Sequence, residues 1–163
     1  MRSPHPLLLG LTMLVPTVCQ GQAKCPWINE ATASGILGGA VTVTVKVPDQ
    51  TAGTCVFSRQ QGAVVHQLRI SVNLMSDFNK QFPSYLAQCP PKSSPLRAIG
   101  NEAVMCSIQG KAGHYGEIVV GRVRNQAFVV SVSSSVQDDP TMTQEMRREK
   151  VSLVAEQVSG ILF

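Results

Sequence analysis

Two stretches of this chain alternate apolar and polar side chains, a pattern that restricts them to β-strands with one buried face. In the first, residues 41–47, every second residue is valine. In the second, residues 66–75, leucine, isoleucine and valine alternate with polar residues. A period of two fits an extended strand and does not fit a helix. The chain must therefore build an antiparallel sheet that buries one apolar face.

Further strand signals follow the same plan, with short turns between them. Residues 54–59 give a third strand in the first half, and residues 103–109, 115–124 and 127–135 give three strands in the second half. The order is helix, three strands, helix, three strands, helix. We therefore predict an α+β fold of two layers, an antiparallel sheet of about six strands with the helices on one face and two disulfides.

Capping residues indicate where the three helices begin and end. Asn29 suits the N-cap of a short helix that Gly38-Gly39 end, and Ser76-Asp77 suits the cap of the second helix. Asp139 before Pro140 is typical of a helix start, so we expect the last helix to begin there. Its apolar face consists of Val151, Val154, Ala155, Val158, Ile161 and Leu162.

The first 23 residues have the pattern of an export signal. Residues 7–18 are mostly apolar, but this run is shorter than the roughly 20 residues that a bilayer span requires. Small residues at Gly21 and Ala23 suit cleavage by signal peptidase. We expect a signal peptide over residues 1–23, a single domain over residues 24–163 and a periplasmic or secreted product.

Cys19 offers an alternative, because a lipoprotein is acylated at such a cysteine. The residue before a lipidated cysteine is usually small, whereas Val18 precedes Cys19 here. Membrane anchoring through Cys19 is the less favoured hypothesis.

Four cysteines remain after the expected cleavage: Cys25, Cys55, Cys89 and Cys106. Four cysteines in an exported chain predict two disulfides, for which three pairings are possible. We favour Cys25–Cys55 and Cys89–Cys106, because each closes a local loop in one half of the chain. The CxxC spacing of zinc ribbons and of redox-active pairs is missing, so we expect no metal and no cofactor.

Charge and motifs exclude several classes of function. The formal net charge of +4 in 163 residues is too small for a protein that binds nucleic acid through clustered Lys and Arg. The sequence has no HExxH, GxSxG, GxxxxGK[ST] or GxGxxG motif, so zincin, hydrolase-elbow and phosphate-loop chemistry have no support.

The side chains that could move protons have simpler explanations. We expect His66 and His114, at strand ends, to be exposed polar residues. The pair Asp138 and Asp139 is explained by helix capping before Pro140. The serines of residues 131–135 have no base nearby in the sequence, which predicts a solvated strand face. We therefore predict that the protein is not an enzyme.

A few residues could form a binding surface. Arg122 and Arg124 share a strand face, and Arg69 could lie on the same sheet surface, where an anionic polymer would find them. Trp27, the only tryptophan, could be an exposed platform for a sugar or a peptide, although packing beside a disulfide is the simpler interpretation. Residues 147–150 mix basic and acidic side chains, which is typical of an exposed helix face.

The chain resembles a group of small exported bacterial domains of unknown function, many of them lipoproteins. The resemblance rests on an early cysteine, a helix ending in Leu-Gly, a cysteine opening a strand, a Gly-x-Glu-Ala turn and a terminal apolar helix. The corresponding residues are Cys25, Leu37-Gly38, Cys55, Gly100-Asn101-Glu102-Ala103 and Leu162. The resemblance implies a two-layer fold and an envelope location, and it implies no catalytic residue because the group has no agreed activity.

Two functions follow as hypotheses. The first is a non-enzymatic exported module that binds an envelope or extracellular component, protein or glycan, through its polar sheet face or its loops. The alternative is a small inhibitor of a secreted hydrolase, a lysozyme or a protease. Its inhibitory element would be the loop of residues 88–96, which Cys89 holds and three prolines stiffen.

Overall fold

The computed structural model describes residues 24–49, 52–91, 93–109 and 114–163. The expected signal peptide and Cys19 lie outside the described residues. The elements are α1 (Glu30–Leu37), β1 (Thr42–Asp49), β2 (Ala52–Gln61), β3 (Val64–Leu74), α2 (Phe78–Leu86), β4 (Ser94–Leu96), β5 (Glu102–Gln109), β6 (Tyr115–Val123), β7 (Gln126–Ser134) and α3 (Gln144–Leu162).

All the strands join one antiparallel sheet in the order β1-β2-β3-β7-β6-β5-β4. The sequence pattern predicted about six strands, and the described residues form seven. The additional strand is β4, in which Ser94 to Leu96 pair with Met105 to Ala103 of β5. Pro95 is acceptable there because β4 lies at the sheet edge, where a missing backbone donor costs little. The α+β class with one antiparallel sheet is confirmed.

The sheet consists of two meanders that meet in its middle. Strands β1, β2 and β3 form the first and β5, β6 and β7 form the second. The junction is the pairing of β3 with β7, which runs from His66↔Ser134 to Leu74↔Gln126. This pairing places the first residues of β3 beside the last residues of β7, at the end of the sheet where the candidate site lies.

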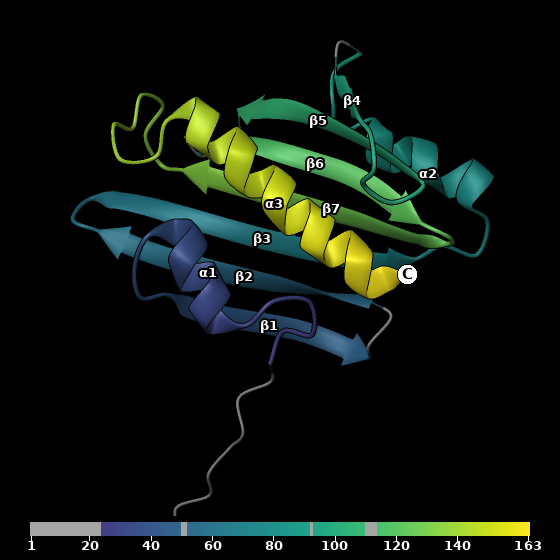
Figure 1. The fold of residues 1–163 in the computed structure, drawn as a ribbon, viewed down its shortest axis with the longest axis horizontal. Helices are drawn as coiled ribbons and strands as arrows, with labels where there is room; N and C mark the ends of the chain where they lie inside the picture. Colours follow the sequence, from purple (N-terminus) through teal and green to yellow (C-terminus); the bar gives the residue numbers. More distant parts are fainter. Residues whose placement is uncertain (1–23, 50–51, 92, 110–113) are drawn as a thin grey trace, which may run out of the picture.

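Helices α1 and α3 cover the same face of the sheet (Figure 1). Helix α3 crosses β6 and β7, and α1 lies over β2 and β3. The apolar face predicted for the last helix is buried there at Val151, Val154, Ala155 and Val158. These side chains join Leu68 and other inward residues of the strands in one core cluster. The burial of this cluster is what fixes α3 over the second meander.

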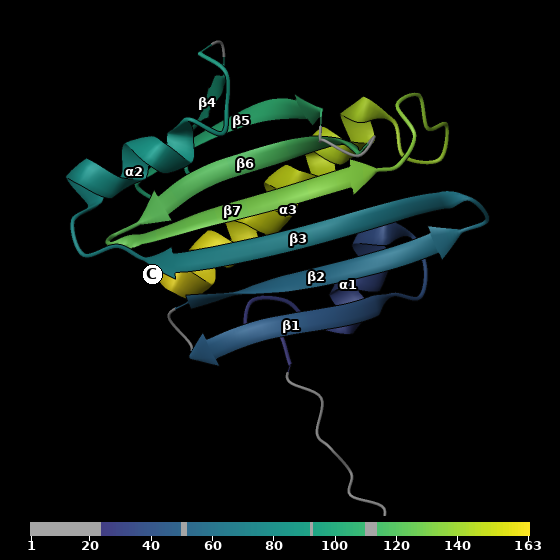
Figure 2. The same cartoon turned by 180° about the vertical axis from the view of Figure 1, so that it is seen from behind.

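Helix α2 lies on the opposite face, which corrects the expectation that the helices share one face (Figure 2). Phe82 of α2 packs in a second cluster with Ile118, Val120 and Ala127, whereas Val119 belongs to the first cluster. Successive strand residues point to opposite faces. Strands β6 and β7 are therefore apolar on both faces, and α2 is needed to cover the second one.

Both disulfides have the favoured pairing. Cys25–Cys55 ties the segment before α1 to β2, and Cys89–Cys106 ties the segment after α2 to β5. Disulfides persist in oxidising compartments, so the two bridges are consistent with an exported protein. No helix within the described ranges has the length and apolarity of a membrane span.

The first two helix starts are confirmed and the third is wrong. Asn29 accepts from the Thr32 amide at the start of α1, and Asp77 accepts from two amides at the start of α2. Helix α3 begins at Gln144, and its N-cap is Thr143, whose hydroxyl accepts from the Met146 amide. Asp139 lies outside the helix because its carboxylate is engaged elsewhere.

Candidate functional site

A pocket of about 380 Å³ opens at one end of the sheet. Its walls come from the end of β5, the start of β6, the loop between β7 and α3, and the first turn of α3. The residues that carry polar groups into it include Ser107, Tyr115, Glu117, Asp139, Gln144 and Arg147. The pocket therefore lies on the face that α3 covers, beyond the point where the apolar part of the helix ends.

Glu117 is the central acid of this pocket, and it is only 1% exposed. Its Oε1 accepts a hydrogen bond of 2.6 Å from the Ser107 hydroxyl and one of 3.0 Å from the Gln144 amide. The same Gln144 amide group donates to Ser107 Oγ at 3.0 Å. One oxygen of the carboxylate is thus held by a neighbouring strand and a helix.

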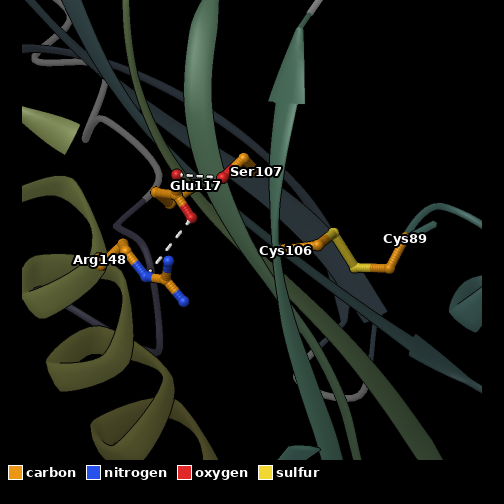
Figure 3. The surroundings of a disulfide bond; sticks show 5 residues. All are labelled: Cys89, Cys106, Ser107, Glu117 and Arg148. Carbon is orange, nitrogen blue, oxygen red and sulfur yellow. Dashed lines mark hydrogen bonds and ion pairs between the residues drawn. A yellow bond between two sulfur atoms is a disulfide. The ribbon is translucent and has the colours of Figure 1, made fainter. Parts of the chain in front are cut away.

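The other oxygen of Glu117 has no hydrogen-bond partner among the described residues. Oε2 is buried, and its ion-pair partner is Arg148, whose Nε lies 4.0 Å away. The Arg148 side chain is 46% exposed, and Figure 3 shows it reaching toward Glu117 from α3. A contact of this length between a half-exposed guanidinium and a buried carboxylate is too long for a hydrogen bond. Glu117 therefore keeps one acceptor oxygen unused.

Figure 3 also shows how β5 positions Ser107 beside Glu117. Cys106 points to one side of the strand, where it is bonded to Cys89, and Ser107 points to the other side, toward Glu117. Adjacent strand residues must diverge in this way. The same strand is thus held by a covalent bridge on one face and by the Glu117 hydrogen bond on the other.

Arg147 is a second buried charge in the pocket. It is 4% exposed, which corrects the expectation of an exposed helix face at this residue, whereas Arg148 and Glu149 are exposed as expected. Its Nη1 donates to the carbonyl oxygen of Met142 at 2.6 Å, while its Nε is buried without a hydrogen-bond partner in the described part of the chain. A guanidinium keeps its charge in proteins. The pocket wall therefore holds one unused donor in addition to the unused acceptor.

Asp139 closes the pocket on the side of the β7–α3 loop. Its Oδ2 lies 2.6 Å from His66 Nε2 and accepts a bond of 2.7 Å from the Ser134 hydroxyl. Its Oδ1 accepts from the amide and the hydroxyl of Thr141. The register that sets His66 beside Ser134 brings both to the same carboxylate.

The exposure expected for the histidines and the strand serines is wrong at this end of the sheet. His66 and Ser134 are fully buried, and Ser133 is buried as well. His114 is half-buried. The reason for the burial of His66 and Ser134 is that Asp139 of the loop before α3 folds over them and supplies their polar partner.

These contacts determine the charge of Asp139. Burial alone raises the pKa of a carboxyl group, but the hydrogen bonds from Ser134, Thr141 and His66 outweigh it and hold the pKa of Asp139 well below its ordinary value. Asp139 is therefore ionised near neutral pH. Because an ionised carboxylate can only accept, Nε2 of His66 carries the proton that it shares with Asp139.

The Ser134, Asp139 and His66 group differs from a serine hydrolase triad in its connections. In a triad the histidine lies between the acid and the serine and takes the proton of the serine. Here the acid lies between them: Ser134 donates to Asp139, and Nδ1 of His66 is buried with no hydrogen-bond partner in the described ranges. Ser134 is therefore not activated as a nucleophile, and the group holds the loop before α3 against the sheet.

The predicted surface residues do not come together. Trp27 is 1% exposed and packs in the core, so it is not an exposed platform. Arg69 pairs at the level of Ser131, whereas Arg122 pairs at the level of Ala127, four residues along the strand and two strands away. Exposed Arg124 lies in the turn after β6 with a φ of 53°.

Arg122 is already engaged by neighbours. Its guanidinium carbon lies 4.4 Å from the ring centre of Phe78, and its Nε lies 3.3 Å from a carboxylate oxygen of Glu102. A guanidinium over an aromatic face is attracted to the ring. Arg122 therefore contributes to the contact of α2 with the sheet.

Sequence reasoning missed Glu117 and Arg147 as site residues. A signal for Glu117 exists, because it directly precedes the apolar run Ile118-Val119-Val120. An acid joined to a strand that is apolar on both faces is expected to be at least partly buried. Arg147 gives no such signal, since charged residues surround it on both sides of the chain.

Neither the metal-ligand search nor the comparisons with known proteins give further information on the function of this site. In the part of the chain that the structure describes, no three His, Cys, Asp or Glu side chains are grouped as metal ligands would be. A scan of protein families finds none that matches this chain, and a search of curated proteins finds no significantly similar sequence.

Proposed function

We propose that this protein is an exported binding module without catalytic activity, and that the pocket at the end of the sheet holds a small polar group of its ligand. The observation that carries the proposal is the unused oxygen of Glu117. It is buried in the wall of an open pocket and has no hydrogen-bond partner among the residues that the structure describes. Leaving a buried polar atom unpaired costs about 1–3 kcal/mol, and more for a charged group. A bound ligand that donates to Oε2 would recover that free energy.

The ionisation state and the hydrogen bonds of Asp139, the second buried acid of the pocket, support binding rather than catalysis. A general acid or base works best with a pKa near the working pH. The pKa of Asp139 is lowered, and both of its oxygens already accept hydrogen bonds. Ser134 donates to Asp139 and not to a base. These side chains therefore stabilise the pocket wall and have no proton or electron pair to offer a substrate.

The expected location of the protein in the envelope indicates where its ligand comes from. The signal-like amino-terminal sequence, the resemblance to small exported bacterial domains and the two disulfides all favour a periplasmic or secreted product. We therefore look for the ligand among small polar components of the bacterial envelope.

The test uses the processed protein and a water-soluble extract of the envelope of the producing cells. After equilibration in a volatile buffer, with the extract still present, native mass spectrometry should show a small-molecule adduct on the wild type. Glu117→Gln should lower its occupancy by about tenfold or more, because a hydrogen bond to a charged group contributes about 1.5–3 kcal/mol. Glu149→Gln, at an exposed acid on α3, is the matched control and should keep the adduct.

Two outcomes contradict the proposal. Equal occupancy in Glu117→Gln and wild type would place any ligand outside this pocket. Conversion of the released ligand to a species of different mass, at a rate that requires the protein, would make it an enzyme.

A second candidate function, inhibition of a secreted hydrolase, is favoured by the loop of residues 88–96. The disulfide Cys89–Cys106 holds its start and the pairing of β4 with β5 holds its end. Pro90, Pro91 and Pro95 are exposed, and Lys92 lies outside the described residues. Figure 1 shows β4 projecting beyond the rest of the sheet. A loop that is held at both ends loses less conformational entropy on binding than a free one.

If the loop inhibits, the protein at micromolar concentration should slow a lysozyme or a trypsin-like, subtilisin-like or metallo-protease in a standard assay. Full activity of each enzyme at a large excess of the protein would remove this candidate. Replacing Pro90 and Pro91 by alanine should weaken true inhibition, and should leave a non-specific effect unchanged.

A further inference from the structure

We infer that the ligand of the pocket is a neutral, hydroxyl-rich molecule, a saccharide or the end of a glycan, and neither a cation nor an anion. This inference rests on the proposed function and names the chemical class of its ligand. It is argued from two buried atoms that have no hydrogen bond among the described residues, the acceptor Oε2 of Glu117 and the donor Nε of Arg147.

The two groups do not satisfy each other. Both side chains line the pocket and both are nine-tenths or more buried. The ion pair of Glu117 is with Arg148 at 4.0 Å, and the bond of Arg147 is to the Met142 carbonyl. A carboxylate can only accept a hydrogen bond, and a guanidinium can only donate one. The two side chains thus leave a buried acceptor and a buried donor without hydrogen bonds in the wall of the same pocket.

The charges decide which ligand completes this arrangement. An ammonium group would pair with Glu117 but would face the buried charge of Arg147 and the charge of Arg148, which already pairs with Glu117. A carboxylate or phosphate would pair with Arg147 but would face three acids of the lining, Glu117, Asp138 and Asp139. Unpaired like charges in a site of low dielectric are strongly unfavourable. A hydroxyl group donates and accepts, so a neutral molecule that carries several hydroxyls can satisfy both groups without adding a charge.

The remaining walls of the pocket also suit a neutral, hydroxyl-rich ligand. The rim carries the amides of Gln109, Gln137 and Gln144 and the hydroxyl of Thr143, all exposed and uncharged, together with the exposed carboxylate of Asp138. Amides also donate and accept. Half-buried Tyr115 adds an aromatic side chain of the kind that takes up the apolar face of a sugar ring.

The experiment is ligand-observed NMR on the processed protein with four separate probes: N-acetylglucosamine, di-N-acetylchitobiose, ethylammonium and acetate. We expect saturation transfer to one or both sugars with a Kd of about 1 mM or tighter, and no transfer to the two ions. Transfer to the monosaccharide indicates a free sugar or a chain end, whereas transfer to the disaccharide alone indicates a glycan. Glu117→Gln should weaken sugar binding about tenfold, and Glu149→Gln should not.

A second measurement uses only the wild type, so it remains valid if the Glu117→Gln variant folds poorly. Raising the NaCl concentration from about 50 mM to about 500 mM should leave the affinity for the sugar within a factor of about two, because screening acts on charged ligands. Stronger binding of ethylammonium or acetate than of the sugars would overturn the inference, as would pocket binding that falls steeply with salt. An envelope adduct that depends on Glu117 but carries no sugar would overturn this inference while leaving the proposed function in place.

Discussion

Replacing Asp139 by alanine is expected to lower the free energy of unfolding by about 4 kcal/mol, a loss at the upper end of what single substitutions cause. The carboxylate is the hydrogen-bond partner of His66, Ser134 and Thr141. Its removal leaves the buried Nε2 of His66 and the buried hydroxyl of Ser134 without this partner. Urea unfolding followed by the fluorescence of Trp27 measures the change.

Asp138→Ala is the matched control, because Asp138 is exposed and precedes Asp139 in the same loop. It should change the free energy of unfolding by less than about 0.5 kcal/mol. A loss of less than about 1 kcal/mol in Asp139→Ala would show that the loop is held by other contacts.

The difference between wild type and Asp139→Ala should also depend on pH. The pKa of Asp139 is lower in the folded protein than in the unfolded chain, where it is about 4. The stabilisation by the carboxylate is therefore complete above about pH 4, and it is lost as the pH falls below that value toward the folded pKa. Unfolding curves from neutral to strongly acidic pH should show the two proteins converging only at the acidic end.

Removing the bridge between Cys25 and Cys55 is the second large effect. The double substitution Cys25→Ala and Cys55→Ala should lower the free energy of unfolding by about 3–4 kcal/mol, because the bridge closes a loop over a sequence separation of 30 residues. The bridge between Cys89 and Cys106 has a separation of 17, and its removal should cost about 3 kcal/mol. Chemical denaturation of both double variants and of the wild type gives the comparison.

Reduced wild type serves as the control for the alanine substitutions. After treatment with dithiothreitol in denaturant and refolding under reducing conditions, it should be at least as unstable as the less stable double variant. Unchanged stability in the Cys25→Ala and Cys55→Ala protein would mean that packing in the core, where Cys55 is fully buried, makes the bridge dispensable.

Local patterns predicted most of the fold. The alternation in residues 41–47 and 66–75 became β1 and β3, and Asn29 and Asp77 cap the helices as expected. These signals act over a few residues, so the sequence displays them directly. The disulfide pairing followed because each bridge is local within its half of the chain.

The start of α3 shows where local reasoning stops. Asp139-Pro140 and Thr143 are both capping signals, and only one can start the helix. Asp139 bonds instead to His66, which is 73 residues away in the chain. A contact between residues so far apart in the chain cannot be recognised from the sequence around Asp139. In the folded protein it outweighs the local preference of Asp139 for capping a helix.

The candidate site escaped prediction for the same reason. Ser107, Glu117 and Gln144 come from β5, β6 and α3, and none of them has a motif around it. The position of α2 on the second face was predicted wrongly, although the sequence contains a signal for it, since the run Phe128-Val129-Val130 is apolar on both faces. Such a strand requires cover on both sides of the sheet.

The central pairing of β3 with β7 has a consequence for how the chain reaches this structure. Each meander consists of strands that follow one another in the chain, so the contacts inside it are short in sequence and can form early. Joining His66 to Ser134 instead closes a long loop of chain, which is entropically costly. The contact of Asp139 with His66 and Ser134 requires residues from both sides of that pairing. The candidate site is therefore complete only once the two halves of the sheet have joined.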